Sequence, residues 1–461
     1  MYKSYLVVAW RNLAKQKGLS FISVFGLAVG IACFSLCAMY VRYERSFDRF
    51  HAKEDQIYRV MVINPDPNPG PQGAASAYMG GPVGPAMKKE LAGVVDFVRY
   101  TQPSIGFVRT GNTNWRESVS YADPAFFTML SFPLKEGDAA TALQDPQSVV
   151  VTESAARRFF GKAEAVGQRI DVELEGAYHT FTVSGVAVDP PANNSLPFQV
   201  VCNIQGINAS MGDEPLTAWR YFGPFITFVQ LQPGSAVGHL LDKFWKQHFT
   251  DKKPTQRHFE LEPLRDIHTD TRLSFYHLPT VEAGTLRILL GLAIAVLLIA
   301  CINFTTLAIG RSAGRAVEVG VRKVIGGSRR TVLLQFLIES FLLTAIAALL
   351  GLGLARLLLP WFERLAEVSL PVDGGLVLPI TVLFVVLVPV VALVAGSYPA
   401  LVLSGFRPVA VLKARIRIGG GNLFTKSLVT LQFVLSAGLV IAALIMLQQL
   451  RFMQSRNPGF K

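Results

Sequence analysis

Five apolar segments constrain the fold of this chain most strongly, because each is long enough to cross a lipid bilayer. Spanning the hydrocarbon core takes about 20 apolar residues, and a helix satisfies its own backbone hydrogen bonds in lipid. The segments are residues 19–43, 286–309, 333–358, 377–403 and 428–448. The first is too long for the apolar part of a signal peptide, and no small-residue cleavage site follows it. The sequence therefore predicts an α-helical membrane protein with five transmembrane helices, the first being an uncleaved anchor.

Residues 44–285, between the first two apolar segments, have the composition of a water-soluble domain. They are rich in Pro, Gly, Asp and Arg, although only 16% of the whole chain is charged, against about 25% in a soluble protein. Of the four cysteines only Cys202 lies here, which excludes an intradomain disulfide. At roughly 240 residues, the domain is large enough to be held by its own hydrophobic core.

Local patterns in this domain indicate both strands and helices. Residues 169–175 alternate apolar and polar side chains, as a half-buried strand does. Gly176 can turn the chain, so residues 180–188 are predicted to be the second strand of a hairpin. Residues 153–160 predict a short helix that Gly161 can end. The predicted fold of the domain is therefore α+β.

The distribution of Lys and Arg predicts the orientation in the membrane. The first 20 residues hold four, the 310–331 loop holds six, and the 404–427 linker holds five. The 359–376 loop holds only Arg364, beside three acidic residues. Because basic loops stay in the cytoplasm, the N-terminus and the two basic loops are predicted to be cytoplasmic. The 44–285 domain, the acidic loop and the C-terminal tail are then predicted to lie outside.

Two features of the N-terminal region predict how it is placed. Residues 1–18 form a predicted amphipathic helix lying along the inner membrane surface. Its apolar face carries Tyr2, Leu6, Ala9, Trp10 and Leu13, and basic residues occupy much of the remainder. Within the first span, the Gly-Ile-Ala-Cys run at residues 30–33 predicts a small-residue surface for helix packing.

The loop between the second and third spans has a helical pattern of its own. Residues 311–327 predict a short amphipathic helix that Gly326 and Gly327 end. Its apolar face carries Val317, Val321, Val324 and Ile325. Glu318 precedes Arg322 by four residues, the favourable order for a helical ion pair. A helix fused between two spans can pass a push from the cytoplasm into the membrane, although composition alone is equally typical of a solvated basic loop.

The residues of this region are similar to the signature of the FtsX-like permease domain. The matching positions are Asn303-Phe304, Arg311-Ser312, residues 318–323, Gly326, residues 335–340, residues 397–401 and Arg407-Pro408. The large domain resembles the MacB periplasmic core domain. There the matching positions are residues 123–127, 149–153, 156–161, Gly167 and residues 181–186. Together the two resemblances cover nearly the whole chain.

The resemblance implies the permease subunit of a MacB/FtsX-type ABC transporter in a bacterial inner membrane. It implies that the 311–327 helix is a coupling helix that meets an ATPase subunit. Arg315, Glu318, Arg322 and Lys323 are the residues carried over to that contact. The implied partners are this ATPase, a second permease copy or second fused half, and a periplasmic adaptor. The implied function couples ATP hydrolysis to movement of the outer domain, for export or for release of envelope substrates.

The fifth apolar segment departs from the family pattern, because a single MacB unit has four spans. Residues 428–461 repeat the plan of the N-terminal unit, with a basic start, one span and a polar exit. The chain is therefore expected to hold the first half of a double-unit permease and the start of a second half.

Other functional classes lack their motifs. The sequence holds no phosphate-binding loop, since Gly161-Lys162 is followed by Ala163 and not by Ser or Thr. ATP hydrolysis is therefore expected to come from a separate protein, and no cofactor is expected in this chain. No close histidine pair predicts a metal site and no G-x-S-x-G motif predicts a catalytic serine. The net charge of +12 lies in short segments beside the spans, which argues against nucleic-acid binding.

Two alternatives stay open from the residues alone. A sensory receptor with an external ligand domain would need a cytoplasmic signalling module, whereas the predicted cytoplasmic segments are all short. A secondary carrier would usually place a carboxylate near mid-bilayer, whereas Glu339 and Arg356 are predicted near the ends of the third span.

Overall fold

The structure, a computed structural model, describes most of the chain and places it in two units. The described residues are 17–66, 74–161, 164–174, 176–208, 212–219, 223–235, 237–249, 257–273, 280–313, 321, 325, 328–370, 385–394, 397 and 423–455. The helical unit comprises Met1–Arg42 with Gly284–Lys461, and the sheet unit comprises Tyr43–Ala283. The predicted amphipathic helix of residues 1–18 lies outside the described residues, apart from its last two, which begin the first helix.

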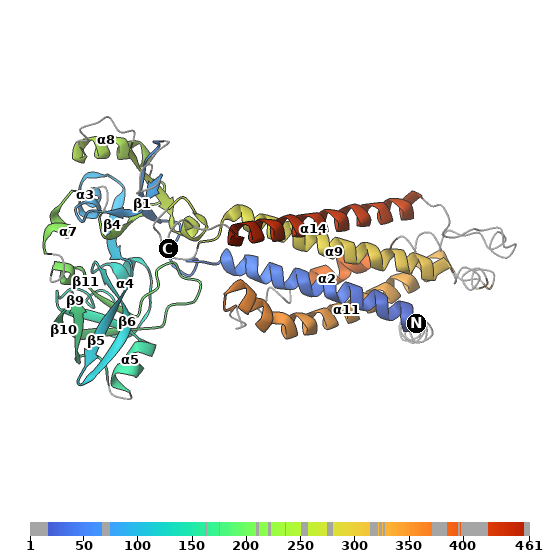
Figure 1. Ribbon diagram of the computed structural model, residues 1–461, viewed down its shortest axis with the longest axis horizontal. Coiled ribbons are helices and arrows are strands. Elements are labelled where there is room, and N and C mark those ends of the chain that lie inside the picture. The colour runs from blue at the N-terminus through green and yellow to red at the C-terminus, as the bar shows by residue number, and fades with distance from the viewer. Residues whose placement is uncertain are drawn as a thin grey trace. The chain divides into compact units, whose positions relative to one another are not determined.

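Four described helices are long and apolar enough to cross a membrane (Figure 1). They are α2 (Lys17–Glu44), α9 (Ala283–Ala313), α11 (Arg329–Ala366) and α14 (Leu423–Ser455). They contain four of the five predicted spans. Of the remaining one, residues 377–403, the structure describes only the apolar helix Val385–Val394 and residue 397, so a fifth span stays a prediction.

Small residues let the helices of the helical unit pack closely. A Cβ atom added to Gly30 would lie 2.5 Å from the Cβ of Ala300, and one added to Gly351 would lie 2.9 Å from the carbonyl oxygen of Ala28. The predicted small-residue surface at residues 30–33 is thus confirmed at Gly30. Around these contacts lies an apolar cluster that includes Leu27, Ile31, Leu297, Phe304, Leu343 and Ala347.

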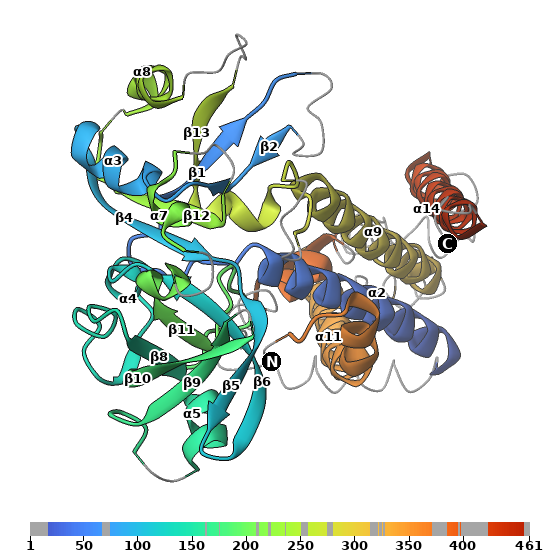
Figure 2. The ribbon, with the colours of Figure 1, turned by 60° about the vertical axis from the view of Figure 1, so that its left-hand side comes forward.

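The first part of the sheet unit is an antiparallel sheet covered by two helices (Figure 2). Its elements are β1 (Ile57–Ile63), α3 (Val83–Glu90), β4 (Val94–Thr101), β12 (Phe225–Leu231), α8 (Gly238–His248) and β13 (His258–Pro263). The strand order β4-β12-β1-β13 is that of two interleaved β-α-β halves. Met87 of α3 and Phe244 of α8 belong to one buried cluster with Val60 of β1, so both helices cover the same face of the sheet.

The second part is a closed barrel inserted between β4 and β12. Its strands are β5 (Ser104–Thr110), β6 (Thr113–Ala122), β8 (Ser148–Thr152), β9 (Arg169–Leu174), β10 (Ala177–Ala187) and β11 (Val200–Asn203). They follow the order β11-β8-β10-β9-β5-β6, and parallel pairing of β11 with β6 closes the ring. Closure pairs the edge strands with each other, so the insertion exposes no long sheet edge.

Two local predictions for the barrel are confirmed. β9 and β10 form the expected antiparallel hairpin, with Gly176 at φ +85° in its turn, although β10 starts three residues earlier than predicted. Helix α5 (Glu153–Phe160) begins after Thr152, whose hydroxyl accepts from the N–H of Ala155, and ends at Gly161 with φ +66°. The α+β fold of the large domain is likewise confirmed.

Short elements complete the sheet unit and enclose its central core. They are β2 (Ala75–Ser76), β3 (Tyr78–Met79), α4 (Phe126–Met129), β7 (Leu134–Glu136), η2 (Ile204–Ile207), α7 (Glu214–Thr217) and η3 (Leu264–Thr269). Phe126 of α4 and Phe198 lie in one buried cluster with Phe228 of β12 and Ile267 of η3. This cluster joins the sheet to the barrel, so the two parts of the sheet unit share a core.

Candidate transmission site

The predicted coupling residues Arg315, Glu318, Arg322 and Lys323 lie outside the described residues. Between α9 and α11, the structure describes Val321 and Ile325 from the predicted apolar face. The N–H of Ile325 donates to the carbonyl oxygen of Val321 at 3.1 Å, the spacing of an α-helical turn. Both side chains are exposed, which leaves them accessible to a partner. The helix over 311–327 and the roles of its charged residues stay predictions.

The described site lies where the chain enters and leaves the sheet unit. We call residues 43–63, which follow the first span, the leading segment, and residues 258–273, which precede the second span, the returning segment. Their strands β1 and β13 are antiparallel neighbours, paired from Tyr58–Pro263 to Ile63–His258. The leading and returning segments are therefore paired with each other within the sheet.

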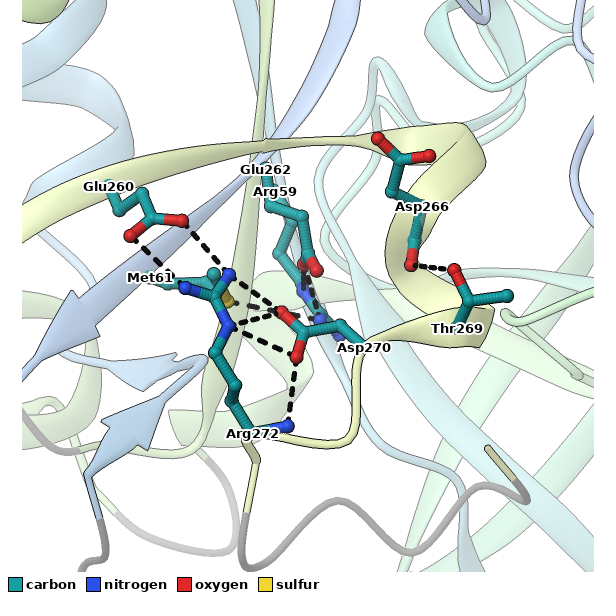
Figure 3. Close-up of polar contacts among 8 residues, drawn as sticks. All are labelled: Arg59, Met61, Glu260, Glu262, Asp266, Thr269, Asp270 and Arg272. Atoms are coloured by element: carbon teal, nitrogen blue, oxygen red, sulfur yellow. Dashed lines mark hydrogen bonds and ion pairs between the residues drawn. The ribbon is translucent and has the colours of Figure 1, made fainter. Parts of the chain in front are cut away.

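A buried ion pair reinforces this strand pair. Arg59 and Glu262 are direct cross-strand partners. The Nε and Nη2 atoms of Arg59 both donate to Oε2 of Glu262, at 2.8 and 2.5 Å (Figure 3). The exposed fractions of these side chains are 0% and 4%. Burial raises the pKa of Glu262, and the adjacent charge of Arg59 opposes that rise.

The polar network continues along the returning segment (Figure 3). Arg272 donates from Nη2 to Asp270 at 2.7 Å and to Glu260 at 2.9 Å. Burial by itself raises the pKa of Asp270, but the hydrogen bonds and charge of Arg272 oppose it and the pKa is lowered to about 2. Arg272 thereby links strand β13 to the turn that follows η3.

A second tie joins the end of α2 to η3. Glu44 is the last residue of α2, and its Oε2 lies 2.5 Å from Nε2 of His268. Both side chains are almost completely buried. The ring of Phe47 stacks on the His268 ring, with centroids 3.4 Å apart and planes within 6°. The residues that follow the first span are thus held against the residues that lead to the second.

The loop 189–199 holds the other side of the leading segment. The hydroxyl of Tyr43 donates to the carbonyl oxygen of Ala192 at 3.1 Å. The side-chain amide of Asn193 donates to the carbonyl oxygen of Ser46 at 2.9 Å. The N–H of Ser195 donates to Oδ1 of Asp48 at 2.9 Å. Burial raises the pKa of the Asp48 carboxyl to about 6, against the lowering by its bonds to Ser195.

His51 completes the packing of the leading segment. Its Nδ1–H donates to the carbonyl oxygen of Leu130, and its ring lies edge-on to Phe132, with centroids 5.1 Å apart. Burial lowers the pKa of His51 to about 4, so the ring is neutral near pH 7. A neutral donor at this position anchors the leading segment to the central core.

Buried contacts therefore connect the leading segment both with the returning segment and with the loop 189–199. Among the described residues, no group of three or more His, Cys, Asp or Glu could hold a metal ion. Sequence reasoning missed this site. Its one visible signal was charge beside an apolar run, at Glu44 and Asp48. The partner residue His268 is 224 positions from Glu44, so no local pattern connects them.

Two family models match the chain. The MacB-like periplasmic core domain matches residues 20–244, and the FtsX-like permease C-terminal domain matches residues 289–404. The two matches lie in the order that the sequence motifs predict.

Curated relatives of the chain are export proteins and permeases. It is 24% identical over 344 residues to the macrolide export ATP-binding/permease protein MacB of Bdellovibrio bacteriovorus, covering 71% of this chain and 48% of that protein. It is 22% identical to the pyoverdine export ATP-binding/permease protein PvdT of Pseudomonas aeruginosa, and the match covers 75% of this chain and 50% of that protein. An uncharacterized ABC transporter permease of Bacillus subtilis, YvrN, is 34% identical over 104 residues, 22% of this chain and 23% of that one. The chain spans about half the length of the MacB relative.

Solved structures of domains from similar proteins also match. A domain of a putative permease from Porphyromonas gingivalis is 25% identical, with a TM-score of 0.39, covering 49% of this chain and 94% of that one. The periplasmic region of MacB from Actinobacillus actinomycetemcomitans is 15% identical, with a TM-score of 0.32, and the match covers 45% of this chain and 90% of that one.

Proposed function

Because this chain belongs to the family of MacB/FtsX-type ABC transporter permeases, we propose that it carries motion from a separate ATPase subunit to its own sheet unit. In this proposal the chain is a non-enzymatic membrane subunit. ATP binding and hydrolysis move the spans, and the spans move the sheet unit for export or for release of an envelope substrate.

The observation that carries the proposal is the fastening of the leading to the returning segment. The pair Arg59–Glu262 and the pair Glu44–His268 are both buried. Breaking a buried ion pair by removing one partner costs about 3–5 kcal/mol. In this proposal a displacement delivered to either segment is shared by both, because separating the segments would break these buried contacts.

On the cytoplasmic side, we propose that residues 311–327 form the coupling helix. Arg315, Glu318, Arg322 and Lys323 would contact the ATPase subunit. This assignment rests on the family motif and on the distribution of basic residues, which also supports a cytoplasmic N-terminus and a sheet unit in the periplasm. Exposed Val321 and Ile325 are compatible with an interface there.

The proposed assembly contains two permease units and an ATPase. A second copy of this chain, or a second fused half, would supply the second unit, and a periplasmic adaptor would be a further partner in an exporter. The curated relatives named as ATP-binding/permease proteins support the association with an ATPase.

Co-purification tests the proposal. The tagged chain, co-expressed with a candidate ABC ATPase, is expected to retain that ATPase through purification in detergent, and the complex is expected to hydrolyse ATP. The chain purified alone is expected to hydrolyse none. Absence of any co-purifying ATPase, or retention of a signalling kinase in its place, would contradict the proposal and favour a sensory receptor.

A further inference from the structure

A cavity of about 420 Å³ in the sheet unit lies against the loop that holds the leading segment. One wall is the loop 189–199, which includes Phe198. The rest of the lining includes Pro103 before β5, Ser118 of β6, and Thr152 and Ser154 at the start of α5. A volume of this size suits a small organic ligand. The transmission site described above does not use this cavity.

The lining of the cavity combines prolines and one carboxylate with hydroxyl and amide side chains. Four of the lining residues are prolines: Pro103, Pro190, Pro191 and Pro197. A proline offers a carbonyl oxygen but no N–H group. The lining includes the carboxylate of Asp189 and contains no Lys, Arg or His. Such a surface disfavours an anion and favours a ligand that donates hydrogen bonds and carries positive charge.

The Asp189 carboxylate is held in position at the cavity wall. Its Oδ1 accepts from the N–H of Ser154 at 3.1 Å, which fixes it at the start of α5. A carboxylate has two oxygens with about four acceptor sites, so the same group can accept a further bond from a ligand. Proline rings offer apolar contacts beside it. The ligand chemistry that fits both features is a protonated amine attached to an apolar ring.

The wall of the cavity is also a partner of the leading segment. Ala192 and Asn194 line the cavity, while the carbonyl oxygen of Ala192 accepts from Tyr43 and the N–H of Ser195 donates to Asp48. A ligand that orders this loop on the cavity side thereby orders the contacts that it makes on the other side.

We propose that this cavity binds a small organic cation, a protonated amine on an apolar ring, and that its occupation is communicated to the leading segment through the loop 189–199. The binding is independent of the function proposed above, whereas the communication to the first span rests on it.

Fluorine NMR on the full chain in lipid nanodiscs tests the binding, with the ATPase absent. The probe is 4-fluorobenzylamine, and 4-fluorobenzyl alcohol and 4-fluorobenzoate are its neutral and anionic counterparts, with empty nanodiscs as the background. We expect the amine to bind and its two counterparts not to bind. Asp189→Asn should weaken amine binding at least tenfold, and Asp189→Glu should restore part of it. Because an Asn oxygen can still accept from Ser154, the fold of the loop is retained.

Equal binding of all three probes, no binding of the amine, or equal binding to Asp189→Asn would overturn the site. Hydrogen exchange tests the second part of the proposal on the same samples. Saturating amine should slow exchange at residues 43–48 as well as at residues 192–199. Slowing confined to the loop would overturn the communication, and this result does not depend on any coupling to an ATPase.

Discussion

Arg59 and Glu262 face each other across β1 and β13, and two guanidinium nitrogens of Arg59 donate to one carboxylate oxygen of Glu262, at 2.8 and 2.5 Å. These residues are 203 positions apart in the chain. They join the strand that follows the first span to the strand that precedes the second. Both side chains are buried, so removing either one leaves the other without its partner away from water.

Removing one partner of this pair is expected to destabilise the sheet unit strongly. Arg59→Met leaves the Glu262 carboxylate buried without its counter-ion, at a cost of about 3–5 kcal/mol. For a domain of this size that lowers the melting temperature by about 10 °C. The double variant Arg59→Met, Glu262→Leu should recover much of the loss, because no charge is left buried. Thermal unfolding followed by near-UV circular dichroism checks both. Equal stability of wild type and Arg59→Met would refute the assignment.

Cutting the tie between Glu44 and His268 is expected to loosen the returning segment locally. Glu44→Ala removes a buried, charge-assisted contact worth about 1.5–3 kcal/mol. Amide exchange at residues 264–270 should therefore become at least about tenfold faster, since about 1.4 kcal/mol is a factor of ten. Arg45→Ala is the control, because Arg45 is the next residue and is exposed. If both variants exchange alike, the contact does not hold η3.

The buried ring of His51 predicts an acid-sensitive contribution to stability. Folded His51 takes up a proton near pH 4, whereas in the unfolded chain it does so near pH 6.5. The unfolded state therefore binds more protons between these values. The stability that His51 contributes is complete above pH 6.5 and is lost as the pH falls toward 4.

His51→Asn keeps an N–H donor for Leu130 but cannot be protonated. We expect the melting temperature of the wild type to fall relative to this variant by several degrees between pH 6.5 and 4, since each unit of pKa displacement is worth about 1.36 kcal/mol. The raised pKa of Asp48, about 6, has the opposite effect, because it stabilises the folded state as the pH falls. This effect is the same in the wild type and in His51→Asn. Parallel pH profiles would show that His51 titrates normally in the folded chain.

Close packing at Gly30 limits the size of the side chain that this position of the helical unit can hold. A side chain at Gly30 meets the Cβ of Ala300, whereas nothing lies within 4 Å of a Cβ added to Gly291. Gly30→Leu is expected to cost about 1–3 kcal/mol through overpacking, and the matched Gly291→Leu should be close to neutral. Thermal stability in nanodiscs measures both. Equal losses in the two variants would contradict the packing of α2 against α9.

How much of this fold could be predicted depended on how local its causes are. The hairpin of β9 and β10 follows from alternation and from Gly176, and the end of α5 follows from Gly161, so both were predictable. The closure of β6 on β11 was not, because it pairs Val119 with Val200 across an intervening stretch of barrel strands.

The transmission site shows the same limit more sharply. Helix α2 extends to Glu44, beyond the predicted apolar run, because a helix need not end where the lipid does. The partners of its last residues, Tyr43 and Glu44, are Ala192 and His268, which come near them only in the folded sheet unit. A single sequence contains no periodicity that connects them. The coupling residues 315–323 were assigned from a family motif and stay a prediction.

Hydrogen exchange of the assembled complex tests the central claim most directly. The chain is reconstituted in nanodiscs with its ATPase, and exchange at residues 43–63 and 258–270 is compared with and without ATP. Glu318→Lys serves as the uncoupled variant, because losing a charge buried against a partner costs about 2–5 kcal/mol. Glu367→Lys, the same charge change at an exposed residue predicted to lie on the other side of the membrane, is the control.

We expect ATP to change exchange at both segments in the wild type and in Glu367→Lys, and to leave it unchanged in Glu318→Lys. Unchanged exchange in the wild-type complex while ATP is being hydrolysed would contradict transmission to the sheet unit.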